Sequence, residues 1–80
     1  MDIRLKKIID LVRAQLGLEF VQPEDRFMEE LGAESVDILN IIASLEDQFL
    51  IELDEAEIAK VTSVLDLYHL LINSMPSETE

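Results

Sequence analysis

The chain has 80 residues, no cysteine and a formal net charge of −12 at pH 7. A chain of this length forms one domain with a small core, and without cysteine it has neither disulfides nor a thiolate metal site. The acidity argues against nucleic-acid binding, which needs the opposite charge, and no apolar run approaches the roughly 20 residues of a membrane-spanning helix.

The charge is distributed unevenly along the chain. Residues 1–18 carry four basic and two acidic side chains, whereas residues 19–66 carry fourteen acidic and two basic ones. An acidic surface of this kind favours encounters with basic partner proteins. An alternative is that the acidity only keeps a small domain in solution. With no secretory signal in view, we expect a soluble, cytoplasmic, monomeric protein.

Residues 3–16 have the periodicity of an amphipathic helix. Apolar residues recur at intervals of three or four and therefore share one face: Leu5, Ile8, Ile9, Val12 and Leu16. Asp2 is expected to cap the start of this helix, and Gly17 is expected to end it. The basic residues of the segment lie outside the apolar face, where we expect them to be solvated.

Residues 17–34 form a long connection without helical periodicity. Pro23, followed by two acidic residues, predicts a turn or the start of a short helical turn. A loop this long in a small domain needs anchors, and its apolar residues supply the candidates: Phe20, Val21, Phe27 and Leu31. Gly32 is expected to supply a backbone conformation or a close approach that a side chain would prevent.

Residues 35–50 form the second predicted helix. Its core face consists of apolar residues in helical register: Ile38, Ile41, Ile42, Leu45 and Phe49. The opposite face is small and apolar with acids around it, and holds Val36, Asn40, Ala43 and Asp47, with Leu39 and Glu46 at its margin. Such a face is typical of an interface with a charged rim, although these residues are also compatible with an ordinary surface.

The remainder of the chain predicts one short and one long helix. Asp54 is expected to cap one or two turns within residues 51–61. Residues 62–74 form the last helix, with Thr62 or Ser63 as its N-cap and Asp66 at the capping-box position. Its inward residues are Val64, Leu67, Tyr68 and Leu71. The predicted fold is a small all-α four-helix bundle in residues 1–75, with a frayed tail in residues 76–80.

Ser35 lies where the long loop ends and the second helix begins. It is therefore an N-cap or first-turn residue, and a phosphate ester on its hydroxyl would be stabilised by the free N–H groups of the first turn. No catalytic residue is expected, because Ser35 lacks a Gly-x-Ser-x-Gly frame and the single histidine, His69, lies in the last helix. The acidic run at residues 52–57 lacks the glycine and ligand spacing of a calcium loop, so no metal site is predicted.

The segment from Phe27 to Asp37 (FMEELGAESVD), followed by LEDQF at residues 45–49, resembles the acyl carrier protein family. The likeness covers nearly the whole chain. It implies a four-helix bundle in which a phosphopantetheinyl transferase attaches 4′-phosphopantetheine from coenzyme A to Ser35, using Mg²⁺. The thiol of that arm then holds acyl groups as thioesters for the enzymes of fatty-acid, polyketide or related synthesis.

The resemblance also implies roles for residues of the second helix. Partner enzymes with basic surfaces would dock on Val36, Asp37, Leu39, Asn40, Ala43 and Asp47. An acyl chain would lie against Ile38, Ile41, Ile42 and Leu45. The chain departs from the family pattern at Glu34, where Asp is usual, at Asn40, where an acid is common, and at Ile38, which is more apolar than the usual residue. Two alternatives are an acidic helical adapter with Ser35 unmodified and a small hydrolase using Ser35.

Overall fold

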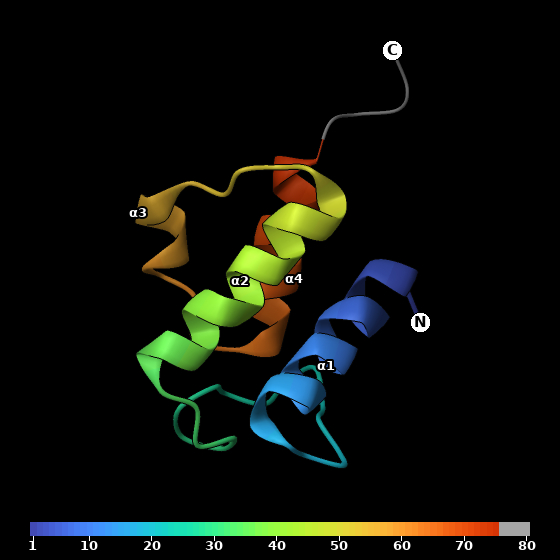
Figure 1. Cartoon of the computed structure of the whole chain (residues 1–80), viewed down its shortest axis with the longest axis vertical. Helices are drawn as coiled ribbons and strands as arrows, with labels where there is room; N and C mark the ends of the chain where they lie inside the picture. Colours follow the sequence, from blue (N-terminus) through green and yellow to red (C-terminus); the bar gives the residue numbers. More distant parts are fainter. Residues whose placement is uncertain (76–80) are drawn as a thin grey trace.

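The computed structural model describes residues 1–75, and the fold in that range is all-helical. Its helices are α1 (Ile3–Leu16), α2 (Ser35–Phe49), α3 (Glu55–Ile58) and α4 (Val64–Ser74). In Figure 1, α2 crosses in front of α4, with α1 to its right and the short α3 to its left. α1 packs against both α2 and α4, and α3 packs against α4. The predicted small helical bundle is confirmed, and the predicted frayed tail at 76–80 lies outside the described residues.

The core is formed by the helix faces that the periodicity predicted, together with residues of the connecting segments such as Phe27. The largest fully buried side chains are Phe27, Ile8, Ile41, Leu45, Leu67, Leu71, Val12 and Val64. Ile42 is also buried, whereas Ile38, Phe49 and Tyr68 are only half-buried at the margin of the core. Burying these apolar side chains is the main source of stability for a domain of this size.

Helix α1 is fixed at both ends as its sequence predicted. The Asp2 carboxylate accepts the Arg4 backbone N–H at 2.8 Å, and Gly17 ends the helix in the left-handed conformation, with φ of 67°. Asp2 also accepts hydrogen bonds from the Arg4 guanidinium (2.8 Å) and the Tyr68 hydroxyl (2.9 Å). These bonds, those from Arg4 first, hold the pKa of Asp2 well below its usual range and tie α1 to α4.

The loop of residues 17–34 is anchored by three of the four apolar residues predicted to do so. Val21 and Phe27 are buried and Leu31 is half-buried, but Phe20 is 79% exposed, so its predicted anchoring role is wrong. The adjacent residue, Val21, is the one that packs into the core.

Backbone hydrogen bonds fasten the same loop to the start of α4. The Phe27 N–H donates to the Thr62 carbonyl at 2.9 Å, while the N–H groups of Val64 and Leu65 donate to the carbonyls of Asp25 (3.1 Å) and Pro23 (2.9 Å). The first N–H groups of a helix have no partner within the helix, so loop carbonyls satisfy donors that would otherwise need water. The loop and α4 therefore form one hydrogen-bonded unit.

Helix α4 begins at Val64, two residues later than predicted, behind a capping box. The Ser63 hydroxyl accepts the Asp66 N–H at 3.1 Å. The Asp66 carboxylate in turn accepts the backbone N–H groups of Thr62 (2.9 Å) and Ser63 (3.2 Å) and the Thr62 hydroxyl (2.8 Å). These hydrogen bonds, with the Thr62 N–H first, lower the pKa of Asp66. The predicted pair of Ser63 and Asp66 is confirmed.

Helix α2 ends at Phe49, one residue before the predicted end, because Leu50 adopts the left-handed conformation with φ of 56° and ψ of 47°. Among the described residues, Leu50 alone combines a positive φ with a side chain, which is 87% exposed. A left-handed conformation costs an ordinary residue about 1–2 kcal/mol, while glycine adds about 0.5–1 kcal/mol of backbone entropy cost. Because the strain energy of the left-handed residue is the larger of the two, replacing Leu50 by glycine should stabilise the fold.

We therefore expect Leu50→Gly to raise the free energy of unfolding by about 0.5–1 kcal/mol. Urea unfolding followed by circular dichroism at the helical band measures this change. Leu50→Ala is the matched control, because it removes the exposed side chain but keeps the Cβ atom in the strained conformation, and it should give no such gain. A Leu50→Gly protein that unfolds at lower urea concentration than the wild type would contradict the prediction.

Candidate functional site

Ser35 is the first residue of α2, and its side chain is exposed. Glu34 precedes it as the N-cap residue in an extended conformation, with φ of −101°. Of the two positions that the sequence allowed, N-cap or first turn, the structure gives the first turn. The hydroxyl therefore lies at the end of α2 where backbone N–H groups have no partner within the helix and the helix dipole is positive.

The chain that leads into Ser35 is held by its own hydrogen bonds. The carbonyl of Arg26 accepts the N–H groups of Glu30 (3.0 Å) and Leu31 (3.1 Å), and the Phe27 carbonyl accepts the Ala33 N–H at 2.8 Å. Gly32 has φ of 70°, and a Cβ atom added there would meet nothing within 4 Å. Of the two roles expected for Gly32, the backbone conformation is therefore the one that applies.

A side-chain hydrogen bond joins α1 to the start of α2 beside Ser35. Asp37 accepts the Glu34 backbone N–H on Oδ2 at 3.0 Å and the Gln15 side-chain amide on Oδ1 at 3.1 Å. These two bonds, that of Glu34 first, lower the pKa of Asp37. The link to Gln15 was not predicted, because the two residues are polar, far apart in sequence and part of no periodic pattern.

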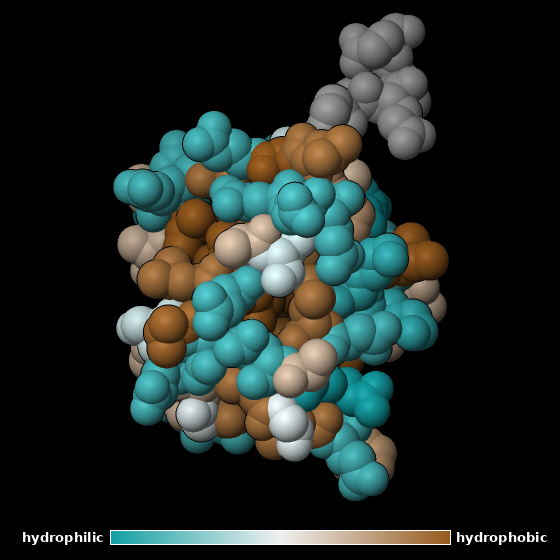
Figure 2. All heavy atoms as spheres, in the orientation of Figure 1, coloured by the Kyte–Doolittle hydropathy of each residue, from teal (hydrophilic) through white to brown (hydrophobic). Residues whose placement is uncertain are grey.

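The face of α2 predicted for partner docking is open to solvent. Val36 and Leu39 are 56% and 57% exposed. Asn40, Ala43 and Asp47 are also exposed, and Asp37 is half-buried. Figure 2 shows apolar residues between hydrophilic ones on the side where α2 and α3 lie. The structure brings these side chains together on one face, and their role in docking stays a prediction.

Two hollows flank α2. The first, of about 330 Å³, is lined by Ile38 together with Phe27, Met28, Ala59 and Val61 among others. Ile38, which lies one helical turn after Ser35, is the residue of α2 in this lining, and Ser35 is not part of it.

The second hollow, of about 460 Å³, lies between α2 and α3 and includes Leu39, Ile42 and Ala43 in its lining. Of the four residues predicted to contact an acyl chain, Ile38 and Ile42 line one hollow each. Ile41 and Leu45 are packed in the core and line neither. The groove beside α3 was not predicted, because the periodicity of one helix does not show what covers its edge.

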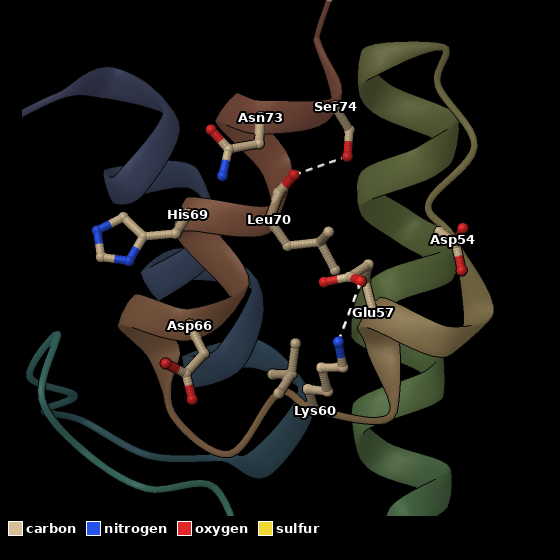
Figure 3. Close-up of a pocket in the computed structure, with 9 residues that line it drawn as sticks. Asp54, Glu57, Lys60, Asp66, His69, Leu70, Asn73 and Ser74 are labelled. Carbon is tan, nitrogen blue, oxygen red and sulfur yellow. Dashed lines mark hydrogen bonds and ion pairs between the residues drawn. The ribbon is translucent and has the colours of Figure 1, made fainter.

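A third hollow, of about 400 Å³, lies between α3 and α4, and most of the residues that line it are charged or polar (Figure 3). The Lys60 ammonium lies 3.3 Å from the Glu57 carboxylate in it, and the exposed His69 projects from α4 away from that ion pair. Ser35 is not part of this lining. A serine nucleophile needs a base within hydrogen-bond reach, so the position of the single histidine gives the hydrolase alternative no support.

Within residues 1–75, no group of three or more His, Cys, Asp or Glu side chains is arranged to hold a metal ion. None of the helices in that range is long and apolar enough to cross a membrane.

Comparison with known proteins identifies the family. Residues 6–71 match the protein family described as the phosphopantetheine attachment site. An acyl carrier protein of Clostridium acetobutylicum is 36% identical over 77 residues, which cover 94% of this chain and 95% of that protein. An acyl carrier protein of Nitratidesulfovibrio vulgaris strain Miyazaki F is 40% identical over 63 residues, which cover 76% of this chain and 83% of that protein.

The fold comparison agrees with the sequence comparison. A crystal structure of an acyl carrier protein from Thermotoga maritima matches with a TM-score of 0.75 and 29% identity, over 90% of this chain and 91% of that one. The family match, the curated relatives and the fold all lead to the same assignment. The chain belongs to the acyl carrier protein family, whose members bear a phosphopantetheine group and are carriers rather than enzymes.

Proposed function

We propose that Ser35 is the residue that bears 4′-phosphopantetheine, and that the protein presents acyl intermediates to the enzymes of fatty-acid, polyketide or related synthesis. The observation that supports this proposal is the position of Ser35. It is the exposed first residue of α2, at the end of a hydrogen-bonded loop and within the part of the chain that matches the attachment-site family. An exposed hydroxyl in this place is open to a modifying enzyme.

The residues around Ser35 fit a phosphate-linked arm. The first-turn N–H groups of α2 would stabilise a phosphodiester at its N-terminus. When bound, the arm supplies the thiol on which acyl groups are held as thioesters. The apolar hollow lined by Phe27, Ile38 and Val61 would shelter an aliphatic chain from water.

The exposed face of α2 supports a docking role in the same scheme. We propose that a phosphopantetheinyl transferase and acyl-processing enzymes bind there, on Val36, Asp37, Leu39, Asn40, Ala43 and Asp47. The face combines exposed apolar side chains with a chain of net charge −12, which favours partners with basic surfaces. We further propose that the protein acts as a monomer in the cytoplasm.

The experiment that tests the attachment site is the intact mass of the protein before and after incubation with coenzyme A, Mg²⁺ and a broad-specificity phosphopantetheinyl transferase. We expect the wild type to gain the mass of one phosphopantetheine. Ser35→Ala should gain nothing while its circular dichroism spectrum stays helical, because the substitution changes an exposed side chain only. Loading of the Ser35→Ala protein would contradict the proposal.

A folded wild type that gains no mass would have two explanations, which Glu34→Asp separates. If the variant is loaded, the transferase used had rejected glutamate before the serine, and Ser35 is the attachment site. If the variant is also not loaded, the result favours the adapter alternative, in which Ser35 stays unmodified.

A further inference from the structure

Both carboxylate oxygens of Asp37 are engaged, and they connect two parts of the molecule. Oδ2 accepts the backbone N–H of Glu34, the residue immediately before Ser35, at 3.0 Å. Oδ1 accepts the side-chain amide of Gln15 from α1 at 3.1 Å. A carboxylate is planar, so a bond to one oxygen restricts the direction of the other.

Gln15 lies in the last turn of α1, and its side chain is exposed. It contributes nothing to the core, and the charge and apolar patterns of α1 do not involve it. Its described contact is the one with Asp37, across the packed pair α1 and α2. The amide is therefore placed to act on the start of α2 without touching Ser35.

We propose that Gln15 is a positioning residue for the modification of Ser35. By holding Oδ1 of Asp37, Gln15 fixes the carboxylate that holds the Glu34 amide, and so fixes the peptide that leads into the serine. The inference rests on the proposed function of Ser35. It adds a residue of the first helix to a site that otherwise consists of α2 and the loop before it.

The consequence for modification follows from geometry. In the loading step, the Ser35 hydroxyl oxygen bonds to the phosphorus of coenzyme A that carries the pantetheine arm, the pyrophosphate P–O bond breaks, adenosine 3′,5′-bisphosphate leaves, and the hydroxyl proton passes to a base of the transferase. This step needs the hydroxyl within reach of that phosphorus and aligned with it, and small displacements of an attacking group reduce the rate. Without the Gln15 amide, the Asp37 carboxylate gains rotational freedom and the Glu34 N–H is held less often. The loss then falls on the rate of the transfer step rather than on docking.

The test compares Gln15→Leu with Gln48→Leu. Gln48 is an exposed glutamine near the other end of α2 from Ser35, so the second variant controls for the same change of side chain. With coenzyme A and a phosphopantetheinyl transferase, we expect Gln15→Leu to lower kcat for loading about threefold to tenfold, which is the fold-change that corresponds to the net free energy of one hydrogen bond. The KM for the carrier protein should stay within about twofold of the wild-type value. Gln48→Leu should load like the wild type.

Three further experiments distinguish a positioning role of Gln15 from a general loss of structure in Gln15→Leu. Gln15→Lys keeps a donor at the same place and should restore most of the rate. Combined with Asp37→Ala, Gln15→Leu should cause no additional loss, because the two side chains act through one contact. In the unmodified protein, NMR titration should show a higher pKa for Asp37 in Gln15→Leu than in Gln48→Leu, since a bond to the charged form is lost.

Several results would overturn the inference. They are equal kcat for Gln15→Leu and Gln48→Leu, a loss confined to KM, or an undiminished effect of Gln15→Leu in the Asp37→Ala background. Any of these, found with a wild type that is loaded, refutes the role of Gln15 and leaves the proposed function intact. If neither the wild type nor Glu34→Asp is loaded, both the role of Gln15 and the proposed function of Ser35 are refuted.

Discussion

Replacing Phe27 by alanine should lower the free energy of unfolding by about 3–5 kcal/mol, the range for removal of a fully buried aromatic ring. The Phe27 side chain is 0% exposed, and its backbone joins the loop to Thr62 and Ala33. A domain of this size has a total stability on the order of 5–10 kcal/mol, so the variant would retain little of it. Urea unfolding followed by circular dichroism measures the loss.

Phe20→Ala is the matched control for this prediction. It makes the same substitution in the same loop, at a side chain that is 79% exposed. Its free energy of unfolding should stay within about 0.5 kcal/mol of the wild type, because little apolar surface changes its environment. Equal destabilisation by the two substitutions would show that burial of Phe27 does not anchor the loop before Ser35.

Replacing Ile38 by threonine should change the length of acyl chain that the protein shelters. Ile38 is half-buried and lines the hollow of about 330 Å³, so its aliphatic side chain occupies space that a bound chain would use. Each methylene removed from water contributes about 0.8 kcal/mol, so room for one more methylene changes the fraction of sheltered chains about fourfold.

The measurement is the melting temperature of the protein loaded with acyl chains of increasing length. In the wild type, the melting temperature should rise with chain length until the hollow is full, and in Ile38→Thr this limit should lie at longer chains. Ile3→Thr makes the same exchange at a residue of α1 that is 68% exposed, and it should leave the limit unchanged. Identical limits for Ile38→Thr and the wild type would show that Ile38 does not shape the hollow.

The three longer helices, α1, α2 and α4, could be predicted from the sequence because each buries one face. The repeat of apolar residues in α1 and α2 predicts the buried positions Ile8, Val12, Ile41 and Leu45. The helix caps could be predicted because each cap involves residues that are close together in the sequence. Asp2 and Ser63 are followed closely by the N–H groups that they accept, so a few residues of sequence contain the whole interaction.

The path of the long loop could not be predicted, because it depends on contacts between distant segments. Nothing near Pro23 or Asp25 in the sequence shows that their carbonyls accept hydrogen bonds from α4. From the sequence, Phe20 and Val21 are equally candidate anchors, and only the folded chain shows that Val21 is buried and Phe20 is exposed. The end of α2 was missed because leucine at position 50 gives no signal for a left-handed residue.

The sequence predicts the parts of the candidate site that depend on neighbouring residues, but it does not predict the contact between residues far apart in the chain. Ser35 could be placed at a helix start because a glycine-containing loop precedes it and an apolar-periodic segment follows. The contact between Gln15 and Asp37 spans two helices and twenty-two positions of sequence. It depends on the packing of α1 on α2, which no pattern within either helix specifies.

The hydrogen bonds between the loop and α4 also set an order of events during translation. Ser35 leaves the ribosome well before residues 62–65, whose backbone groups hold the loop at Pro23, Asp25 and Phe27. At about 5–20 residues per second, the ribosome needs a few seconds to synthesise the intervening segment. During that interval a nascent chain contains the serine but lacks the bonds that place it. We therefore expect a modifying enzyme to distinguish folded protein from unfinished chains without contacting α4.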